Sequence, residues 1–501
     1  MRFIQKNKNT VISLINVLVS AIQSLWLLGY VQKIMDVEAY GYIAVITSFV
    51  NMAHIVTIVF TTFTARYVSL ELHKKRINKA NEYFNASFFG LLLISGIMVI
   101  IFSMLAVSAR MWLNVSDQYV SQVQLLLLLI GGSFIVTTFS TPMKAGVYYA
   151  NKTYIMHGLQ VLSYLGRIIF ALVLYGYFPA KLWYAYIGSF VIDTISLFVY
   201  FSIYKKLMPG IKITWTSFSA GAMKDIISSG LWMSINKIGA VLLANINVII
   251  MSTLISVYIT GVYATIVQFV SLIGVLTMTL LSTFVPNIYR FYADDDIEKF
   301  REYVSKCVKI ISITNGFIVG GMLVFQKYLL SLFISNDYMD HNFIIILTLI
   351  YIPLAFSANV LEQVLIAYNK FKIPAISQLI AGAANIVLIL LISKLLNIGI
   401  YGILISTIVV AVVRDVFFIP LYTNAVTLYQ AKDYYRSVLF GIITCVYTVV
   451  ISRIMVSIKA PSSWEIFIIE VFLVSVLFVA FYFVISSKQE TQFLITNLKG
   501  G

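Results

Sequence analysis

The recurrence of long apolar runs constrains this chain more than any other feature of its sequence. Each run is close to the ~20 residues that a helix needs to cross a bilayer. The chain is 60% hydrophobic and 11% charged, whereas soluble domains carry about a quarter charged residues. We therefore expect an all-α polytopic membrane protein with fourteen spans at about 11–34, 40–63, 84–107, 119–141, 154–177, 182–203, 228–252, 258–284, 306–328, 342–366, 374–397, 398–421, 437–457 and 464–487.

The distribution of basic residues predicts the orientation of these spans. The formal net charge is +15, but the lysines and arginines lie in short loops between the apolar runs, so nucleic acid is not expected as a partner. With the N-terminus inside, the inner segments hold 25 basic residues and the outer segments hold 7. Because cytoplasmic loops are enriched in Lys and Arg, both termini are expected to be cytoplasmic.

The first half of the pattern begins again near residue 230. A shift of 220 positions places Met233–Val270 on Ser13–Val50, with 6 identities in the 14 positions that start at Val37. Two later pairs keep nearly the same offset: Asn151-Lys152 with Asn369-Lys370, and Asp193 with Asp415. Six spans separate the copies, so both enter the membrane in the same direction. This predicts two parallel six-helix repeats that form two lobes, followed by two additional helices. The expected boundaries are 1–203, a cytoplasmic linker at 204–227, 228–425 and 426–501.

Polar side chains within the spans indicate a binding cavity. Lys237 lies about ten residues into the seventh span, roughly 15 Å from its inner end at 1.5 Å per residue. Because a charge in the membrane is costly without a partner or water, we expect a hydrated cavity between the halves. The alternative is that the amides bridge helices and Lys237 pairs with a carboxylate. The candidate cavity residues are Asn16, Gln23, Asn51, His54, Arg167, Asn236, Lys237 and Asn247.

The other intramembrane charges favour ion pairs. Asp193 is the nearest partner for Arg167 by depth, and this structural pair competes with a substrate contact for Arg167. Arg414 and Asp415 are adjacent, so their side chains should point about 100° apart, which favours pairing across helices. Glu362 lies near the inner end of its span and is expected to reach the interface. The lone His54 is more typical of packing than of proton transfer.

Two inner segments, 65–84 and 287–306, combine Tyr and Phe with Lys and Arg. They are expected to form either amphipathic interfacial helices or surface struts that link spans.

Several absences argue against an enzyme. The sequence has no His, Cys and carboxylate cluster for a metal and no Gly-rich phosphate loop ending in Lys-Ser/Thr. No cofactor is expected, and the pattern indicates a carrier.

The chain resembles the polysaccharide-transporter branch of the MOP exporters. The similarity rests on the start of two helices, Gly41-Tyr42 with Phe49 and Gly261-Val262-Tyr263-Ala264 with Phe269, and on Tyr368-Asn369-Lys370. Together with fourteen spans and a 6+6 repeat, it covers essentially the full chain and implies a MOP/MATE-like fold.

That resemblance implies a Wzx-type flippase of the bacterial cytoplasmic (inner) membrane. Such a protein would move undecaprenyl-pyrophosphate-linked oligosaccharide for O-antigen of lipopolysaccharide, capsule or exopolysaccharide, with Lys237 at the anionic head group. A proton or a sodium ion would be the coupling ion, and membrane lipids the surrounding partners. The alternatives within the superfamily are a lipid II flippase and a multidrug/cation antiporter. A lipid II flippase would carry a cluster of arginines on the first two spans. A multidrug/cation antiporter would carry an acidic residue on the first or seventh span. Neither is present.

Overall fold

The computed structural model describes residues 8–485, except 114, 230, 295, 335–339 and 397. Within these residues every regular element is helical, and fourteen helices are long and apolar enough to cross a membrane. The predicted fold class is therefore confirmed. The two termini and the end of the last predicted span lie outside the described residues. The chain divides into two compact units, 1–261 and 262–501, and the predicted lobe boundaries stay a prediction.

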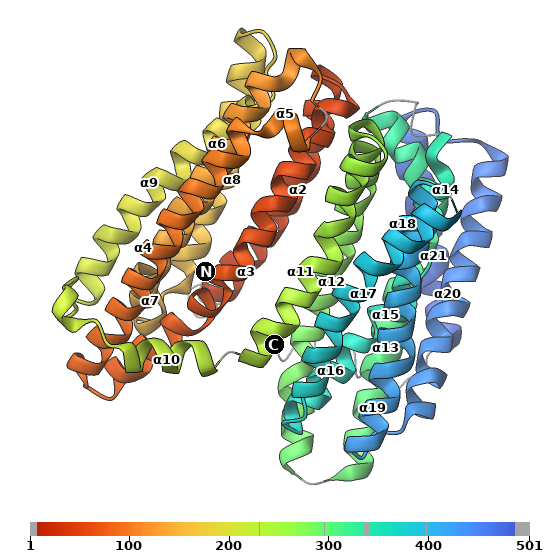
Figure 1. Cartoon of the computed structure of the whole chain (residues 1–501). Coiled ribbons are helices and arrows are strands. Elements are labelled where there is room, and N and C mark those ends of the chain that lie inside the picture. Colours follow the sequence, from red (N-terminus) through yellow and green to blue (C-terminus); the bar gives the residue numbers. More distant parts are fainter. Residues whose placement is uncertain are drawn as a thin grey trace. The chain divides into compact units, whose positions relative to one another are not determined.

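The first unit is a bundle of long helices that lie side by side (Figure 1). Two of its spans are followed by shorter helices: α5 begins two residues after the end of α4, and α7 begins two residues after the end of α6. Its helices are α2 (Lys8–Ile34), α3 (Val37–His73), α4 (Ile77–Val107), α5 (Ala109–Trp112), α6 (Val120–Phe139), α7 (Thr141–Tyr149), α8 (Thr153–Tyr177), α9 (Tyr184–Leu207), α10 (Ala220–Ser229) and α11 (Leu231–Leu254).

The second unit contains most of α12 (Val257–Ala293) and all later helices. Two of its predicted spans are each built from three consecutive pieces. Pro353 stands at the start of one such piece, α15, where its missing N–H is tolerated. The remaining helices are α13 (Ile297–Phe333), α14 (Asn342–Leu349), α15 (Ile352–Ala355), α16 (Ala358–Ala367), α17 (Lys372–Leu396), α18 (Ile400–Ala411), the π-helix η4 (Val412–Phe418), α19 (Ile419–Val426), α20 (Ala431–Ile458) and α21 (Trp464–Ile485).

A cluster of aromatic and aliphatic side chains joins α3, α4, α7 and α9 in the first unit. Phe84 is fully buried there and stacks on Tyr204, with 5.0 Å between ring centroids. The Tyr204 hydroxyl donates a hydrogen bond to the Ile211 carbonyl oxygen at 2.7 Å, so its one polar atom is satisfied. This cluster fixes α9 against α4, which places Asp193 of α9 beside its neighbours on α8.

Glycines allow α13 and α20 to pack backbone to backbone in the second unit. A Cβ added at Gly316 would stand 2.2 Å from the Gly441 carbonyl oxygen. One added at Gly320 would stand 2.7 Å from the Cys445 carbonyl oxygen. Small residues at such spacing are typical of close helix contacts in membranes. The thirteenth span, which has no counterpart in the first repeat, is therefore part of the core of this unit.

Three helices are longer than predicted. The spans expected at 40–63, 258–284 and 306–328 lie within α3, α12 and α13, each of 37 residues. The segments 65–84 and 287–306 accordingly consist largely of the ends of long helices, α3 and α4 in the first and α12 and α13 in the second. They form struts between spans and not separate interfacial helices. Hydropathy identifies only the apolar part of a helix, which is why the polar extensions were not predicted.

The two halves of the sequence repeat adopt the same local structures. Asn151 and Asn369 both have a left-handed backbone, with φ of 52° and 54°. In the first unit, Val37 and Gly41 pack reciprocally on their counterparts Val257 and Gly261. A Cβ at either glycine would stand 2.2 Å from the carbonyl oxygen of the opposite valine. The repeat found in the sequence is therefore also a repeat in structure.

Replacing Asn151 or Asn369 with alanine is expected to lower the free energy of unfolding by about 1–2 kcal/mol. This is the steric cost of the left-handed conformation for a residue that has a Cβ atom and no side-chain group to hydrogen-bond locally. Glycine at the same positions adopts a positive φ without this strain, so Asn151→Gly and Asn369→Gly should be close to neutral. Thermal unfolding of the purified protein in detergent measures both. Equal losses for alanine and glycine would contradict the role of the backbone.

Candidate functional site

Helix α11 presents the polar side chains that the sequence predicted as the centre of the site. The Lys237 side chain is exposed, and among the described residues it has no hydrogen bond or ion pair. Asn236 is half-buried, and its side-chain Nδ2 has no hydrogen-bond partner in the described part of the chain. Asn247 is only 1% exposed, so it packs within the unit and does not line an open space. Of these three, Lys237 is the group that is available to a ligand.

The depth of Lys237 differs from the prediction. Helix α11 begins at Leu231, because residues Ala220–Ser229 form the separate helix α10. Lys237 is six residues beyond that start, about 9 Å at 1.5 Å per residue and not 15 Å. Lys237 is therefore nearer the start of its helix than the sequence predicted.

An amide pair links α3 to α11. The Asn51 side-chain Nδ2 donates to the Asn245 Oδ1 at 3.1 Å, and both residues belong to the first unit. Asn51 is exposed, so this pair faces outward from the packed interior. His54, one turn further along α3, places its ring edge-on to Phe134, with 4.7 Å between centroids. This contact fits the packing interpretation of His54.

The predicted residues of α2 face α8. The Asn16 Nδ2 donates to the Gln160 Oε1 at 2.9 Å and lies 3.5 Å from the His157 Nδ1. Gln23 is 8% exposed and is therefore largely enclosed. The structure thus separates the predicted set into two groups, one on α2 with α8 and one on α3 with α11.

Arg167 of α8 pairs with Asp193 of α9, as the sequence suggested. The Arg167 Nη2 donates to both carboxylate oxygens, at 3.0 and 3.2 Å. The two side chains are 24% and 9% exposed, so the pair is mostly enclosed. Ser163 lies at 3.5 Å from the same carboxylate. The substrate contact proposed for Arg167 stays a prediction.

Lys144 was expected in a cytoplasmic loop but lies on α7. Its ammonium group is 5.1 Å from the centre of the Tyr200 ring. Burial lowers the pKa of Lys144 to about 8, while the attraction of Asp193 opposes that shift. The clue in the sequence was Pro142, which can begin a short helix instead of a loop.

Arg414 of the second unit contacts two carboxylates. Its Nη2 donates to the Glu362 Oε1 at 2.6 Å, and its Nη1 donates to the Asp415 Oδ1. The angle between adjacent side chains did not predict this contact, because the long Arg414 side chain turns back to reach the carboxylate of its neighbour Asp415. The expectation that Glu362 simply reaches the interface is wrong, since Glu362 forms an ion pair with Arg414. Pairing across helices is nevertheless observed, between η4 and α16.

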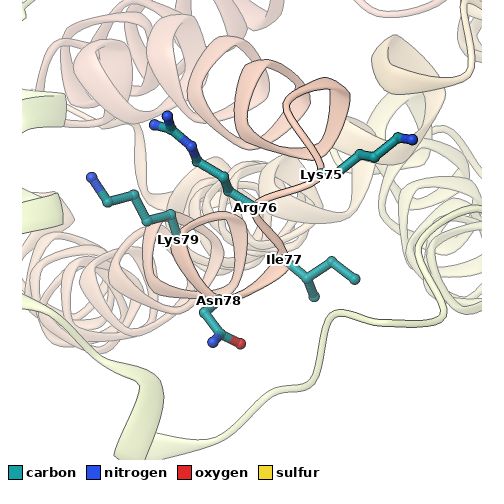
Figure 2. Close-up of a pocket in the computed structure, with 5 residues that line it drawn as sticks. All are labelled: Lys75, Arg76, Ile77, Asn78 and Lys79. Atoms are coloured by element: carbon teal, nitrogen blue, oxygen red, sulfur yellow. The ribbon is translucent and has the colours of Figure 1, made fainter.

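A basic surface pocket of about 500 Å³ lies at the turn between α3 and α4. Figure 2 shows Arg76 and Lys79 on one side of this turn and Lys75 on the other. Glu71 already lies within 3.5–3.8 Å of Lys74 and Arg76. The cations diverge and are partly neutralised, so this pocket is a weaker candidate site than α11.

Helices of membrane length define a polytopic membrane protein, and polar and charged side chains enclosed between them are typical of transporters. A family model described as "Polysaccharide biosynthesis protein" matches residues 7–292, more than half of the chain. The chain belongs to this family, which is the polysaccharide-transporter branch of the MOP exporters. The proteins of this branch are transporters and not enzymes.

Individual relatives agree with this assignment. The chain is 25% identical over 486 residues to the "Uncharacterized membrane protein EpsK" of Bacillus subtilis (strain 168), and the match covers 96% of each chain. The fold is similar to that of the lipid II flippase MurJ in an inward closed conformation, with a TM-score of 0.71 and 15% identity over 95% of this chain and 98% of that one. It is also similar to an inward-facing MATE family multidrug transporter, with a TM-score of 0.58 and 13% identity over 82% and 95%.

Proposed function

We propose that this chain is a flippase for oligosaccharide units linked to undecaprenyl pyrophosphate. It moves them from the inner to the outer leaflet of the bacterial cytoplasmic membrane by alternating access. The observation that carries the proposal is Lys237, an exposed cation on the apolar helix α11 without an ion-pair partner among the described residues. An anionic head group supplies the partner that this ammonium group lacks.

The chemistry of the substrate matches the chemistry of these side chains. A pyrophosphate offers several anionic oxygens, and hydrogen bonds between charged groups are roughly twice as strong as neutral ones. The amides of Asn51, Asn236 and Asn245 can donate to and accept from sugar hydroxyls. In this proposal the start of α11 faces the cytoplasmic leaflet, and a lysine about 9 Å along the helix meets the lipid head group as it enters.

The comparisons support the coarser part of this proposal. The family is described as one of polysaccharide biosynthesis, and the protein of similar fold with the TM-score of 0.71 is a flippase of lipid II. The excess of basic residues in the inner segments supports a cytoplasmic location for both termini. The translocated oligosaccharide units would be used in the assembly of O-antigen, capsule or exopolysaccharide.

Lys237→Ala is expected to lower the rate of transport at least ~10-fold, since a hydrogen bond to a charged group contributes ~1.5–3 kcal/mol and 1.4 kcal/mol is a factor of ten. Lys237→Arg keeps the charge and should retain most of the activity. The measurement uses purified protein in proteoliposomes that contain a fluorescent polyprenyl-pyrophosphate oligosaccharide. Surface polysaccharide in a strain that lacks the native gene provides the cellular readout.

Lys224→Ala is the matched control, because it removes an exposed lysine from the neighbouring helix α10. It should leave transport unchanged. Full activity of Lys237→Ala at equal protein level would overturn the role of Lys237. Transport of lipid II alone, or of drug cations alone, would assign the chain to one of the two alternative functions of the superfamily.

A further inference from the structure

The second unit contains a charged cluster in which one arginine forms ion pairs with two carboxylates. Arg414 and Asp415 lie on η4, and Glu362 lies on α16. The Arg414 side chain is 8% exposed and each carboxylate side chain is 17% exposed. All three lie within helices long and apolar enough to span a membrane. Water therefore has little access to the cluster.

The charges of this cluster do not balance. With every group ionised, two carboxylates and one guanidinium leave a net charge of −1. In the described part of the chain, the ion pairs of both Glu362 and Asp415 end on Arg414, so no second cation contacts either carboxylate. The neighbouring phenols are those of Tyr351, Tyr401, Tyr422, Tyr434 and Tyr435, and Lys372 lies at the start of α17. Helix α13 also packs against α16, but its cations on that half of the helix are bound elsewhere: Arg301 to Asp433, Lys306 to Glu302, and Lys309 to the Ile485 carbonyl oxygen.

Those neighbours do not supply the missing positive charge. Tyr351 and Tyr434 interact with Asp415, but a neutral phenol brings no charge. The Tyr422 and Tyr435 hydroxyls donate to backbone carbonyl oxygens, of Lys370 and Val416. Lys372, the first residue of α17, is exposed.

Arg414 neutralises neither carboxylate completely. It binds each through a single terminal nitrogen, and not through two parallel hydrogen bonds. Its third nitrogen, Nε, is buried and has no acceptor among the described residues, although Arg414 is only 7% exposed. Each carboxylate therefore keeps oxygen lone pairs that the guanidinium does not occupy.

The repeat provides a comparison within the same chain. Asp193 is the counterpart of Asp415, and among the described residues its one ion pair is with Arg167. The counterpart of Glu362 is Lys144, 218 residues earlier, the same separation as between Asn151 and Asn369. The equivalent position in the first unit thus carries a cation, and the second carboxylate is specific to the second unit.

We propose that Glu362, Arg414 and Asp415 form a proton-binding site that holds one proton at neutral pH. Two carboxylates that share a site of low water access cannot both ionise easily, and the pair then titrates as a unit. A proton from water adds to one carboxylate oxygen and forms a carboxylic acid, while the other carboxylate stays ionised and keeps its ion pair with Arg414. The cluster then has no net charge, which removes the cost of a charge within the membrane. The π-helix is consistent with a functional site, because such segments often occur at them.

Infrared spectroscopy of the purified protein in detergent tests this site without any substrate. At pH 7 the wild-type protein should show a carbonyl-stretch band of protonated carboxylic acid that shifts in heavy water. Asp415→Asn and Glu362→Gln should each remove the part of the band that belongs to the cluster. Both variants leave one carboxylate for Arg414, so a balanced pair remains and the protein should fold; if one does not, the other decides.

Two further variants make the assignment specific. Glu470 is buried on α21 with one carboxylate oxygen unpartnered, and the measurement is made in a Glu470→Gln background so that this side chain cannot contribute to the band. The exposed Glu465 on the same helix is the control, and Glu465→Gln should change nothing. No loss of band in either cluster variant would overturn the proposal. Loss of the wild-type band when sodium replaces potassium in the buffer would also overturn it, because the ligand would then be a metal cation.

Discussion

Gly316→Ala is expected to lower the free energy of unfolding by about 3 kcal/mol, the upper end of the usual cost of adding a methyl group to a packed interior. The added Cβ would stand 2.2 Å from the carbonyl oxygen of Gly441 and 3.2 Å from the backbone nitrogen of Cys445. These neighbours are backbone atoms of α20, so no side chain can rotate away. The two helices would have to separate along the contact that joins the thirteenth span to the unit.

Gly321 on the same helix provides the matched control. A Cβ at Gly321 would meet nothing within 4 Å. Because alanine favours a helix over glycine by roughly 0.5–1 kcal/mol, Gly321→Ala should be neutral or slightly stabilising. Thermal unfolding in the same detergent measures both variants. Equal stability of the two variants would show that α13 and α20 do not pack as closely as the glycine contacts indicate.

The sequence was sufficient for the number and the order of the spans, because a run of apolar residues directly reports the length available to cross a bilayer. It was not sufficient for the length of α3, α12 and α13, whose polar ends continue beyond the apolar part. The spacing of Gly316 and Gly320, four residues apart, carried a signal for close helix packing. The partner helix could not be read from that spacing, because it depends on the arrangement in space.

The candidate site was predictable to a smaller extent. The pairing of Arg167 with Asp193 followed from their similar depth, which a sequence gives once the spans are known. The contact between Arg414 and Asp415 did not follow, because the angle between adjacent side chains does not show whether a long arginine side chain turns back to its neighbour. Asn245 was passed over in favour of Asn247, since the choice between two amides on one helix depends on which face meets α3.

Asp193→Asn is expected to lower the free energy of unfolding by about as much as Gly316→Ala. It leaves the Arg167 guanidinium with a neutral partner in a mostly enclosed position, and breaking a buried ion pair costs about 3–5 kcal/mol. Because Arg167 is 24% exposed, water relieves part of this cost, and we expect about 3 kcal/mol. Unfolding of the purified protein in detergent measures the loss.

The double variant Arg167→Leu with Asp193→Leu separates the two interpretations of Arg167. Replacing both charges with apolar side chains is often neutral for a buried pair, so it should recover most of the stability that Asp193→Asn loses. Lys144 then loses the attraction of Asp193, which limits the recovery. If the pair is structural, the stable double variant also transports normally in proteoliposomes. A double variant with native stability but without transport would instead show that the charges of this pair act in transport, because its two charges are then the groups missing from a correctly folded protein.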